Sequence, residues 1–123
     1  MVRCGVDLVK VPRIRDAIEK HGKSFLQRVF TSGEIAYCES HKRRKFEHYA
    51  GRFAAKEAFY KAVSPQDAKI RFKDIEIKHL SNGAPSFFIS EEEKKRVGLS
   101  ENANVSVTLS HDTDYAVAVV LIT

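Results

Sequence analysis

One long helix is the strongest structural signal in this sequence. Residues 46–63, FEHYAGRFAAKEAFYKAV, contain five alanines and no proline. Ser64-Pro65 follows directly, and this pair is typical of a helix stop. Gly51 costs the helix about 1 kcal/mol relative to alanine unless another element packs closely against it. This segment is therefore the clearest predicted helix, and the other elements are predicted around it.

Strand patterns lie on both sides of this helix. Residues 2–9 alternate, with Cys4, Val6 and Leu8 on one face and Asp7 on the other. After the helix, residues 74–80 alternate, a turn-rich segment follows, and residues 87–89 return as a strand. Residues 105–110 alternate and residues 115–122 are almost entirely apolar, which predicts a C-terminal hairpin.

Shorter helices are predicted from their boundary residues. Pro12 suits the first turn of a helix that ends at Gly22, and helical spacing continues over residues 25–30. Thr31 and Glu34 form a capping-box pattern that begins another helix, and Ser90 begins a short one. The order of one strand, several helices and then mostly strands predicts an α+β fold, an antiparallel sheet packed against helices, in a single domain over residues 1–123.

Charge is unevenly distributed. The net charge is +5, with 14 basic and 7 acidic residues in positions 1–62 but 7 basic and 9 acidic residues in positions 63–123. A basic half attracts polyanions such as nucleic acid, an anionic membrane, phosphorylated small molecules or an acidic protein. The alternative interpretation is that the lysines and arginines only keep the surface soluble.

No apolar run reaches the roughly 20 residues of a membrane helix. With two cysteines and no visible secretory signal, we expect a cytoplasmic protein.

A row of side chains on the long helix offers the first candidate chemistry. Phe53, Glu57 and Lys61 follow each other four residues apart and line one helix face. Glu57 and Lys61 alone are an ordinary surface pair worth roughly 0.3–0.5 kcal/mol, and Asp7 alone is either a turn former ahead of Pro12 or a carboxylate near a strand end. Together, two carboxylates and a lysine could hold Mg²⁺ on a phosphate, because Mg²⁺ takes one or two carboxylates plus phosphate oxygens and water. The sequence does not show whether Asp7 and Glu57 meet.

Other catalytic motifs receive little support. The five histidines have no HxxxH or HExxH spacing, and neither GxGxxG nor a P-loop is present. Ser110-His111 has no partner for a catalytic triad close in sequence, so a structural histidine in a turn is the simpler interpretation. The basic run 42–45 could contact nucleic acid, but no aromatic RNA-binding signature or helix-turn-helix accompanies it.

Five segments, in order and at matching spacing over essentially the whole chain, resemble the holo-acyl-carrier-protein synthases, the small 4′-phosphopantetheinyl transferases. The segments are Gly5-Val6-Asp7-Leu8 with Arg13-Ile14, Phe30-Thr31-x-x-Glu34, residues 51–62 (similar to W/F-x-x-K-E-x-x-x-K), Asn82-Gly83-Ala84-Pro85, and Ser106-x-Thr108-x-Ser110-His111. Lys20 and Lys23 stand where arginine is common in relatives, which keeps the charge but loses bidentate hydrogen bonding.

The resemblance implies an enzyme of fatty acid biosynthesis that moves 4′-phosphopantetheine from coenzyme A to a serine of apo acyl carrier protein and releases adenosine 3′,5′-bisphosphate. It also implies a homotrimer with active sites between subunits. By analogy, Asp7 and Glu57 would bind Mg²⁺, with Glu57 also a candidate base, and Lys61 would neutralise phosphate oxygens. The residues expected to bind coenzyme A are Lys61, Arg43, Arg44, Arg52, Ser110 and His111 near phosphates, and Gly83 and Pro85 beside the adenine. The residues expected to bind the acidic carrier are Arg13, Lys20, Lys23 and Arg28.

Two alternatives stay open at this point. A basic, non-enzymatic nucleic-acid-binding domain would explain the run 42–45, but it leaves Asp7 and Glu57 without a role. A structural or partner-binding module would predict no coenzyme A binding. We expect the transferase, with no nucleic-acid partner and no membrane partner.

Overall fold

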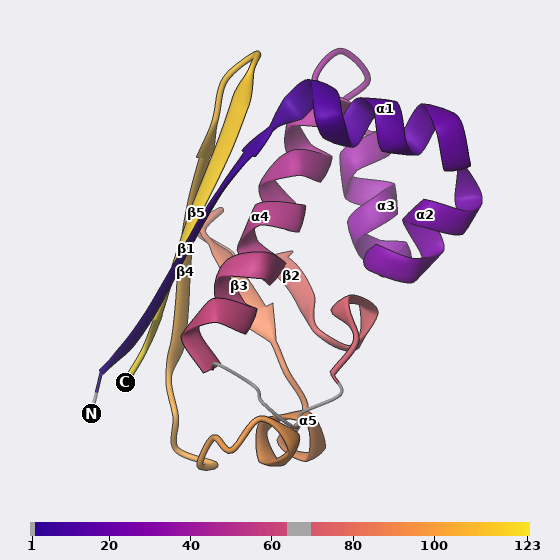
Figure 1. The fold of residues 1–123 in the computed structure, drawn as a ribbon. Helices are drawn as coiled ribbons and strands as arrows, with labels where there is room; N and C mark the ends of the chain where they lie inside the picture. Colours follow the sequence, from indigo (N-terminus) through magenta and orange to yellow (C-terminus); the bar gives the residue numbers. More distant parts are fainter. Residues whose placement is uncertain (1, 64–69) are drawn as a thin grey trace.

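A computed structural model describes residues 2–63 and 70–123, so the predicted stop at Ser64-Pro65 lies outside the described residues. The predicted long helix is α4 (Lys45–Val63). It lies on an antiparallel sheet of order β1-β5-β4, formed by β1 (Arg3–Lys10), β4 (Val105–His111) and β5 (Tyr115–Ile122). Figure 1 shows the helices on one side of this sheet only. The predicted α+β class, with helices on an antiparallel sheet, is confirmed.

Strand β1 and helix α4 cross in direct contact at Gly5. A Cβ atom at this position would overlap the carbonyl oxygen of Ala58 and lie 2.8 Å from the nitrogen of Ala62. Closer to the N-terminal end of α4, a Cβ atom on Gly51 would lie 3.3 Å from Cδ1 of Leu109, a residue of β4 (Val105–His111). The predicted reason for Gly51, close packing of another element, is therefore confirmed, and Gly5 lets the strand approach the helix closely.

Three short helices cover one end of α4. Helix α1 (Val11–His21) follows β1 directly with Pro12 in its first turn, and Gly22, at φ +54°, separates it from α2 (Lys23–Val29). Helix α3 (Ser32–Glu39) begins with the predicted capping box: Glu34 N donates to Thr31 Oγ1 at 3.2 Å, and Thr31 N donates to Glu34 Oε1 at 2.9 Å. These N-terminal helix predictions are confirmed.

A second, two-stranded sheet packs against β4 and α3. It consists of β2 (Glu76–His79) and β3 (Pro85–Phe88), between the 3-10 turn η1 (Phe72–Asp74) and α5 (Glu91–Arg96). The strand predicted over residues 74–80 is shorter than expected, because Asp74 closes the local turn by accepting a bond from Arg71 N at 3.0 Å. The return strand begins at Pro85, opposite His79, two residues before the predicted start.

The face of β1-β5-β4 that points away from the helices is apolar and exposed. Val6 pairs with Val119 and Cys4 with Leu121, so these side chains share that outer face. The exposed fractions are 52% for Val6, 37% for Val119 and 40% for Leu121, and Leu8 reaches 64%. The inner face carries Gly5 and Val9, which are buried. Separately, none of the described helices is long and apolar enough to cross a membrane.

Candidate active site

The crossing of β1 and α4 brings Asp7 and Lys61 together across 54 positions of sequence. Lys61 Nζ lies 3.0 Å from Asp7 Oδ1 and also donates to the carbonyl oxygen of Val6 at 3.1 Å. The Asp7 side chain is 16% exposed and the Lys61 side chain is 55% exposed. Lys61 is therefore tied to β1 and still presents its ammonium group to solvent.

Glu57 faces the same crossing. Burial raises the pKa of Glu57 above its ordinary value, the negative charge of Asp7 raises that pKa further, and Lys61 and Arg13 lower it. Asp7 and Glu57 are thus near enough to repel each other, a relationship that the sequence left open. Arg13, expected at the carrier-binding surface, also lies close enough to act on Glu57.

Two neighbouring carboxylates with partial burial are chemically suited to a hard divalent cation. Mg²⁺ binds through one or two carboxylates and takes its other ligands from phosphate and water. A cation between Asp7 and Glu57 would relieve the repulsion that raises the pKa of Glu57. Within residues 2–63 and 70–123, no group of three or more His, Cys, Asp or Glu side chains could hold a metal. Because two carboxylates leave other ligand positions of Mg²⁺ open, the donor set at this crossing fits a metal that is shared with a phosphate ligand.

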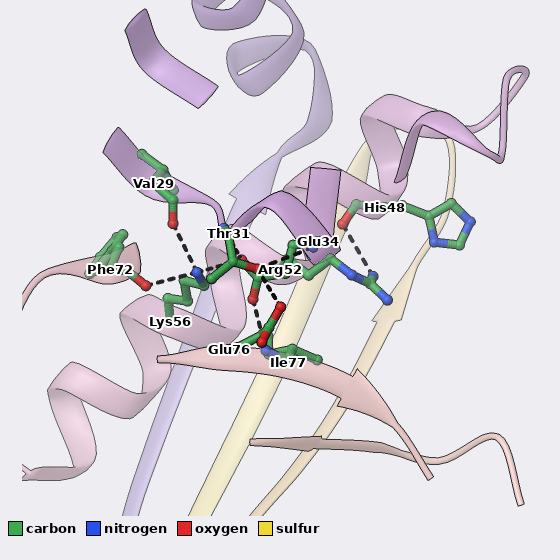
Figure 2. Close-up of polar contacts among 9 residues, drawn as sticks. All are labelled: Val29, Thr31, Glu34, His48, Arg52, Lys56, Phe72, Glu76 and Ile77. Carbon is green, nitrogen blue, oxygen red and sulfur yellow. Dashed lines mark hydrogen bonds and ion pairs between the residues drawn. The ribbon is translucent and has the colours of Figure 1, made fainter. Parts of the chain in front are cut away.

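On a different face of α4, Lys56 forms a buried ion pair with Glu34, and Figure 2 shows its neighbours. Lys56 Nζ donates to Glu34 Oε1 at 2.6 Å and to the carbonyl oxygens of Val29 and Phe72, each at 2.8 Å. Glu34 Oε2 accepts from Ile77 N at 2.8 Å. The pair thus joins α2, α3, η1 and β2 to α4. Lys56 directly precedes Glu57 in the sequence, so this pair anchors the turn of α4 that carries Glu57.

Arg43 and Arg44, both expected to contact phosphate, line an open pocket of about 730 Å³ at the loop that connects α3 to α4. Ser40, His41, Lys42, Glu47 and Thr113 complete its lining. Both arginine side chains are exposed, so the pocket has a strongly basic rim. Such a pocket is suited to an anion.

Arg52 differs from these two arginines because its side chain is buried. Its guanidinium carbon lies 4.3 Å from the centre of the Tyr37 ring. Nη1 donates to the carbonyl oxygen of His48 at 3.3 Å, as drawn in Figure 2, and Nη2 lies 3.3 Å from Nε2 of His79. The expected contact of Arg52 with a phosphate stays a prediction.

The other expected contact residues lie at three further places. Ser110 and His111 end β4 and line a small pocket of about 160 Å³. Gly83, at φ +87°, lies in the turn between β2 and β3, and Pro85 begins β3. The carrier-binding candidates lie on α1 and α2 with exposed side chains: Arg13, Lys20, Lys23 and Arg28. Their predicted roles in binding remain predictions.

The chain matches known proteins along nearly its whole length. Residues 3–120 match the model of the 4′-phosphopantetheinyl transferase superfamily. The holo-[acyl-carrier-protein] synthase of Ruminiclostridium cellulolyticum is 44% identical over 119 residues, which cover 96% of this chain and 89% of that protein. The protein of the same name from Gloeobacter violaceus is 40% identical over 118 residues, 96% of this chain and 89% of that protein.

The chain belongs to the holo-[acyl-carrier-protein] synthase family. Two solved synthase structures share the fold of this family member. The structure from Helicobacter pylori, in complex with coenzyme A, has a TM-score of 0.84 and 31% identity, covering 98% of this chain and 99% of that one. The structure from Neisseria meningitidis has a TM-score of 0.81 and 32% identity, covering 100% and 99%. The family suggested by the five sequence segments is thereby confirmed.

Two features of this synthase-family chain went unpredicted. Lys56 belongs to the segment 51–62 that resembles the family motif, but we predict no role for it from the sequence. A lysine on a helix face between alanines is nevertheless a signal for a buried, paired cation. The contacts among four histidines could not be predicted, since their sequence positions show no ligand spacing and three-dimensional packing alone brings them together.

Proposed function

We propose that this chain transfers the 4′-phosphopantetheine group of coenzyme A to a serine hydroxyl of apo acyl carrier protein, as one transferase domain. The observation that carries the proposal is the meeting of Asp7, Glu57 and Lys61 at the crossing of β1 and α4. A pair of carboxylates beside an ammonium group is suited to a diphosphate with its metal. The structural likeness to the Helicobacter pylori synthase in complex with coenzyme A supports that ligand.

In the proposed reaction, the serine oxygen attacks the β-phosphorus of coenzyme A. The bond from that phosphorus to the bridging oxygen breaks, and adenosine 3′,5′-bisphosphate leaves with the electron pair. Lys61 neutralises the charge that grows on the leaving group, because its ammonium group is held at the site by Asp7. Glu57 accepts the serine proton directly or through a water molecule, and its raised pKa suits that role.

Asp7 and Glu57 would hold Mg²⁺ in this proposal. When bound there, Mg²⁺ supplies Lewis-acid polarisation of the diphosphate oxygens. Arg43 and Arg44 would bind a phosphate at the basic pocket, with Arg52, Ser110 and His111 nearby, and Gly83 and Pro85 would contact the adenine. Exposed Lys20, Lys23 and Arg28 would attract the acidic carrier and raise the rate of encounter.

We further propose a homotrimer. The supporting observation is the apolar outer face of β1-β5-β4, where Val6, Leu8, Val119 and Leu121 are each between 37% and 64% exposed. A contiguous apolar sheet face is costly in water and marks an interface. A second copy of the chain that covers this face would pack against β1, the strand that carries Asp7 on its opposite face.

The cysteines support a cytoplasmic location. Cys4 is exposed and Cys38 is buried, and both are free thiols in the structure. Exposed free thiols persist in a reducing compartment. We therefore infer that this protein acts in the cytoplasm.

The decisive experiment incubates the protein with coenzyme A, Mg²⁺ and apo acyl carrier protein, and then measures the intact mass of the carrier. We expect the carrier to gain the mass of one 4′-phosphopantetheine group, and the gain to stop when EDTA removes the metal. An unchanged carrier mass at all Mg²⁺ concentrations, together with salt-sensitive binding to any polynucleotide, would favour the nucleic-acid-binding alternative.

A further inference from the structure

Four of the five histidines of this chain gather in one cluster with Tyr37. We call His41, His48, His79 and His111, together with Tyr37, the histidine cluster. Ring centres lie 4.1 Å apart for His41 and His48, and 4.8 Å apart for His48 and His111. The Tyr37 ring stacks on His79 at 4.4 Å and contacts His41 at 4.6 Å. Elements distant in sequence therefore join four imidazoles into one chain of ring contacts, in which Tyr37 links His79 to the other three.

His48 lies at the centre of this cluster. The groups that face it come from every neighbouring element: Tyr37 from α3, His41 from the loop before α4, Glu47 and Arg52 from α4, His79 from β2 and His111 from β4. Glu47 Oε1 lies 3.0 Å from His111 Nδ1. Most of the charge around His48 is therefore cationic once the imidazoles take up protons.

The cluster adjoins the basic pocket. His41 is one of the pocket-lining residues, together with Lys42, Arg43 and Arg44. His111 lines the small pocket at the end of β4. The central ring of His48 thus touches one histidine that lines the basic pocket and another at the end of β4.

Without an anion, this arrangement opposes protonation. Burial lowers the pKa of His48 to about 4, and the charges of His41, Arg52, His111 and His79 lower it as well. The Nδ1 atom of His48 is buried and has no hydrogen-bond partner among the described residues. An anion in the pocket reverses the electrostatic part of this effect, because a negative charge stabilises every imidazolium near it. Protonation of one imidazole then affects its neighbours, because the ring centres lie 4.1 Å and 4.8 Å apart.

We propose that the histidine cluster takes up a proton from solvent when a phosphate monoester binds in the basic pocket, so that this synthase-family chain binds the phosphate end of its nucleotide more tightly as the pH falls. The proposal rests on the proposed function, since it assumes that a nucleotide phosphate occupies this pocket. By linkage, a ligand that binds with proton uptake gains affinity at lower pH in proportion to the number of protons taken up. The contribution of the cluster to binding would therefore grow as the pH falls, whereas the charge of an arginine stays the same over this range.

The test measures binding of adenosine 3′,5′-bisphosphate by titration calorimetry in buffers of different ionisation enthalpy. The dependence of the observed enthalpy on the buffer gives the number of protons taken up. At pH 6, we expect the wild-type protein to take up about 0.5 proton more than His48→Gln and His41→Gln. From pH 7.5 to pH 6, that difference corresponds to an affinity gain about fivefold larger in the wild type than in the variants. Release of protons by the nucleotide itself is common to all proteins and cancels in this comparison.

His21→Gln is the matched control, because His21 is exposed on α1 and lies outside the cluster. It should reproduce the wild-type proton number. Equal proton uptake in the wild type, His48→Gln and His41→Gln would overturn the proposal. If His48→Gln does not fold, His41→Gln decides the comparison, since its ring lies in a loop at the pocket. A wild-type protein that binds no nucleotide at either pH would instead contradict the proposed function.

Discussion

The ammonium nitrogen of Lys56 lies 2.6 Å from Oε1 of Glu34, and neither side chain is exposed to solvent. Burial lowers the pKa of Lys56, and Glu34 opposes that effect. The two carbonyl oxygens of Val29 and Phe72 use the remaining ammonium donors. A buried pair with all its hydrogen bonds made holds the surrounding segments at one geometry, although apolar residues of similar volume can be equally stable.

Lys56→Met should reduce the free energy of unfolding by about 3–5 kcal/mol, because it leaves the Glu34 carboxylate buried without its cation. The double variant Lys56→Met/Glu34→Gln should lose less, since no charge remains to be compensated. Urea unfolding of the three proteins measures both values. Equal losses in the single and double variants would contradict this account of the pair.

Gly5→Ala should be strongly destabilising, by about 3 kcal/mol or more, because the new methyl group overlaps the backbone of α4 at Ala58. Gly51→Ala, a substitution on α4 itself, is the matched control. Its methyl group meets the flexible end of Leu109 at 3.3 Å, and alanine favours the helix by about 1 kcal/mol. We therefore expect thermal unfolding of Gly51→Ala within a few degrees of the wild type. Similar melting temperatures for both variants would show that the strand can move away from the helix.

Asp7→Ala and Glu57→Ala should each abolish transfer while the fold stays intact. Both carboxylates are needed to hold the metal with the diphosphate. Each is partly buried, but the Lys61 side chain beside them is 55% exposed, so truncation leaves no cation buried without a partner. Carrier mass gives the activity, and circular dichroism with thermal unfolding gives the fold. Near-normal turnover of either variant at saturating Mg²⁺ would remove that residue from the metal site.

Lys61→Ala should lower kcat about 10²-fold or more, and it should change the KM for coenzyme A by less. The reason is that charge on the leaving bisphosphate grows as the bond breaks, so the contact strengthens in the transition state. Lys61→Arg should recover only part of the rate, because a planar guanidinium places its charge differently. Steady-state kinetics of both variants provide the measurement. Wild-type kcat in Lys61→Ala would limit Lys61 to its structural contact with Asp7.

Lys23→Glu should raise the KM for the carrier protein and leave coenzyme A binding unchanged. Lys23 is exposed on α2, and a Debye length of about 8 Å at physiological salt already screens such charges, so added salt should imitate the substitution. Lys95→Glu makes the same charge change on α5, at the other end of the fold (Figure 1), and should leave the carrier KM unchanged. Arg13 is unsuitable for this comparison because its charge also acts on Glu57. A carrier KM that ignores salt would contradict electrostatic attraction.

Local signals were sufficient for most elements of the fold. The capping box of Thr31 and Glu34, the helix stop at Gly22 and the alternation of residues 105–110 each depend on residues within a few positions of one another. Such signals act through backbone dihedrals and short-range hydrogen bonds, so the chain reveals them directly. The strand predicted at residues 74–80 was too long because alternation alone does not reveal a side chain that closes a turn.

Contacts between distant segments required the folded arrangement. Asp7 meets Lys61 across 54 positions because Gly5 lets β1 lie directly on α4, and no periodicity in either segment encodes that crossing. The exposure of Val6 and Leu8 is likewise decided by which face of β1 the helix covers, since alternation separates two faces without saying which is buried. The pKa of His48 is set by its burial and by three imidazoles and one guanidinium that four separate segments supply. Burial and Coulomb interactions depend on distance in space, and distance in space is a property of the packed chain.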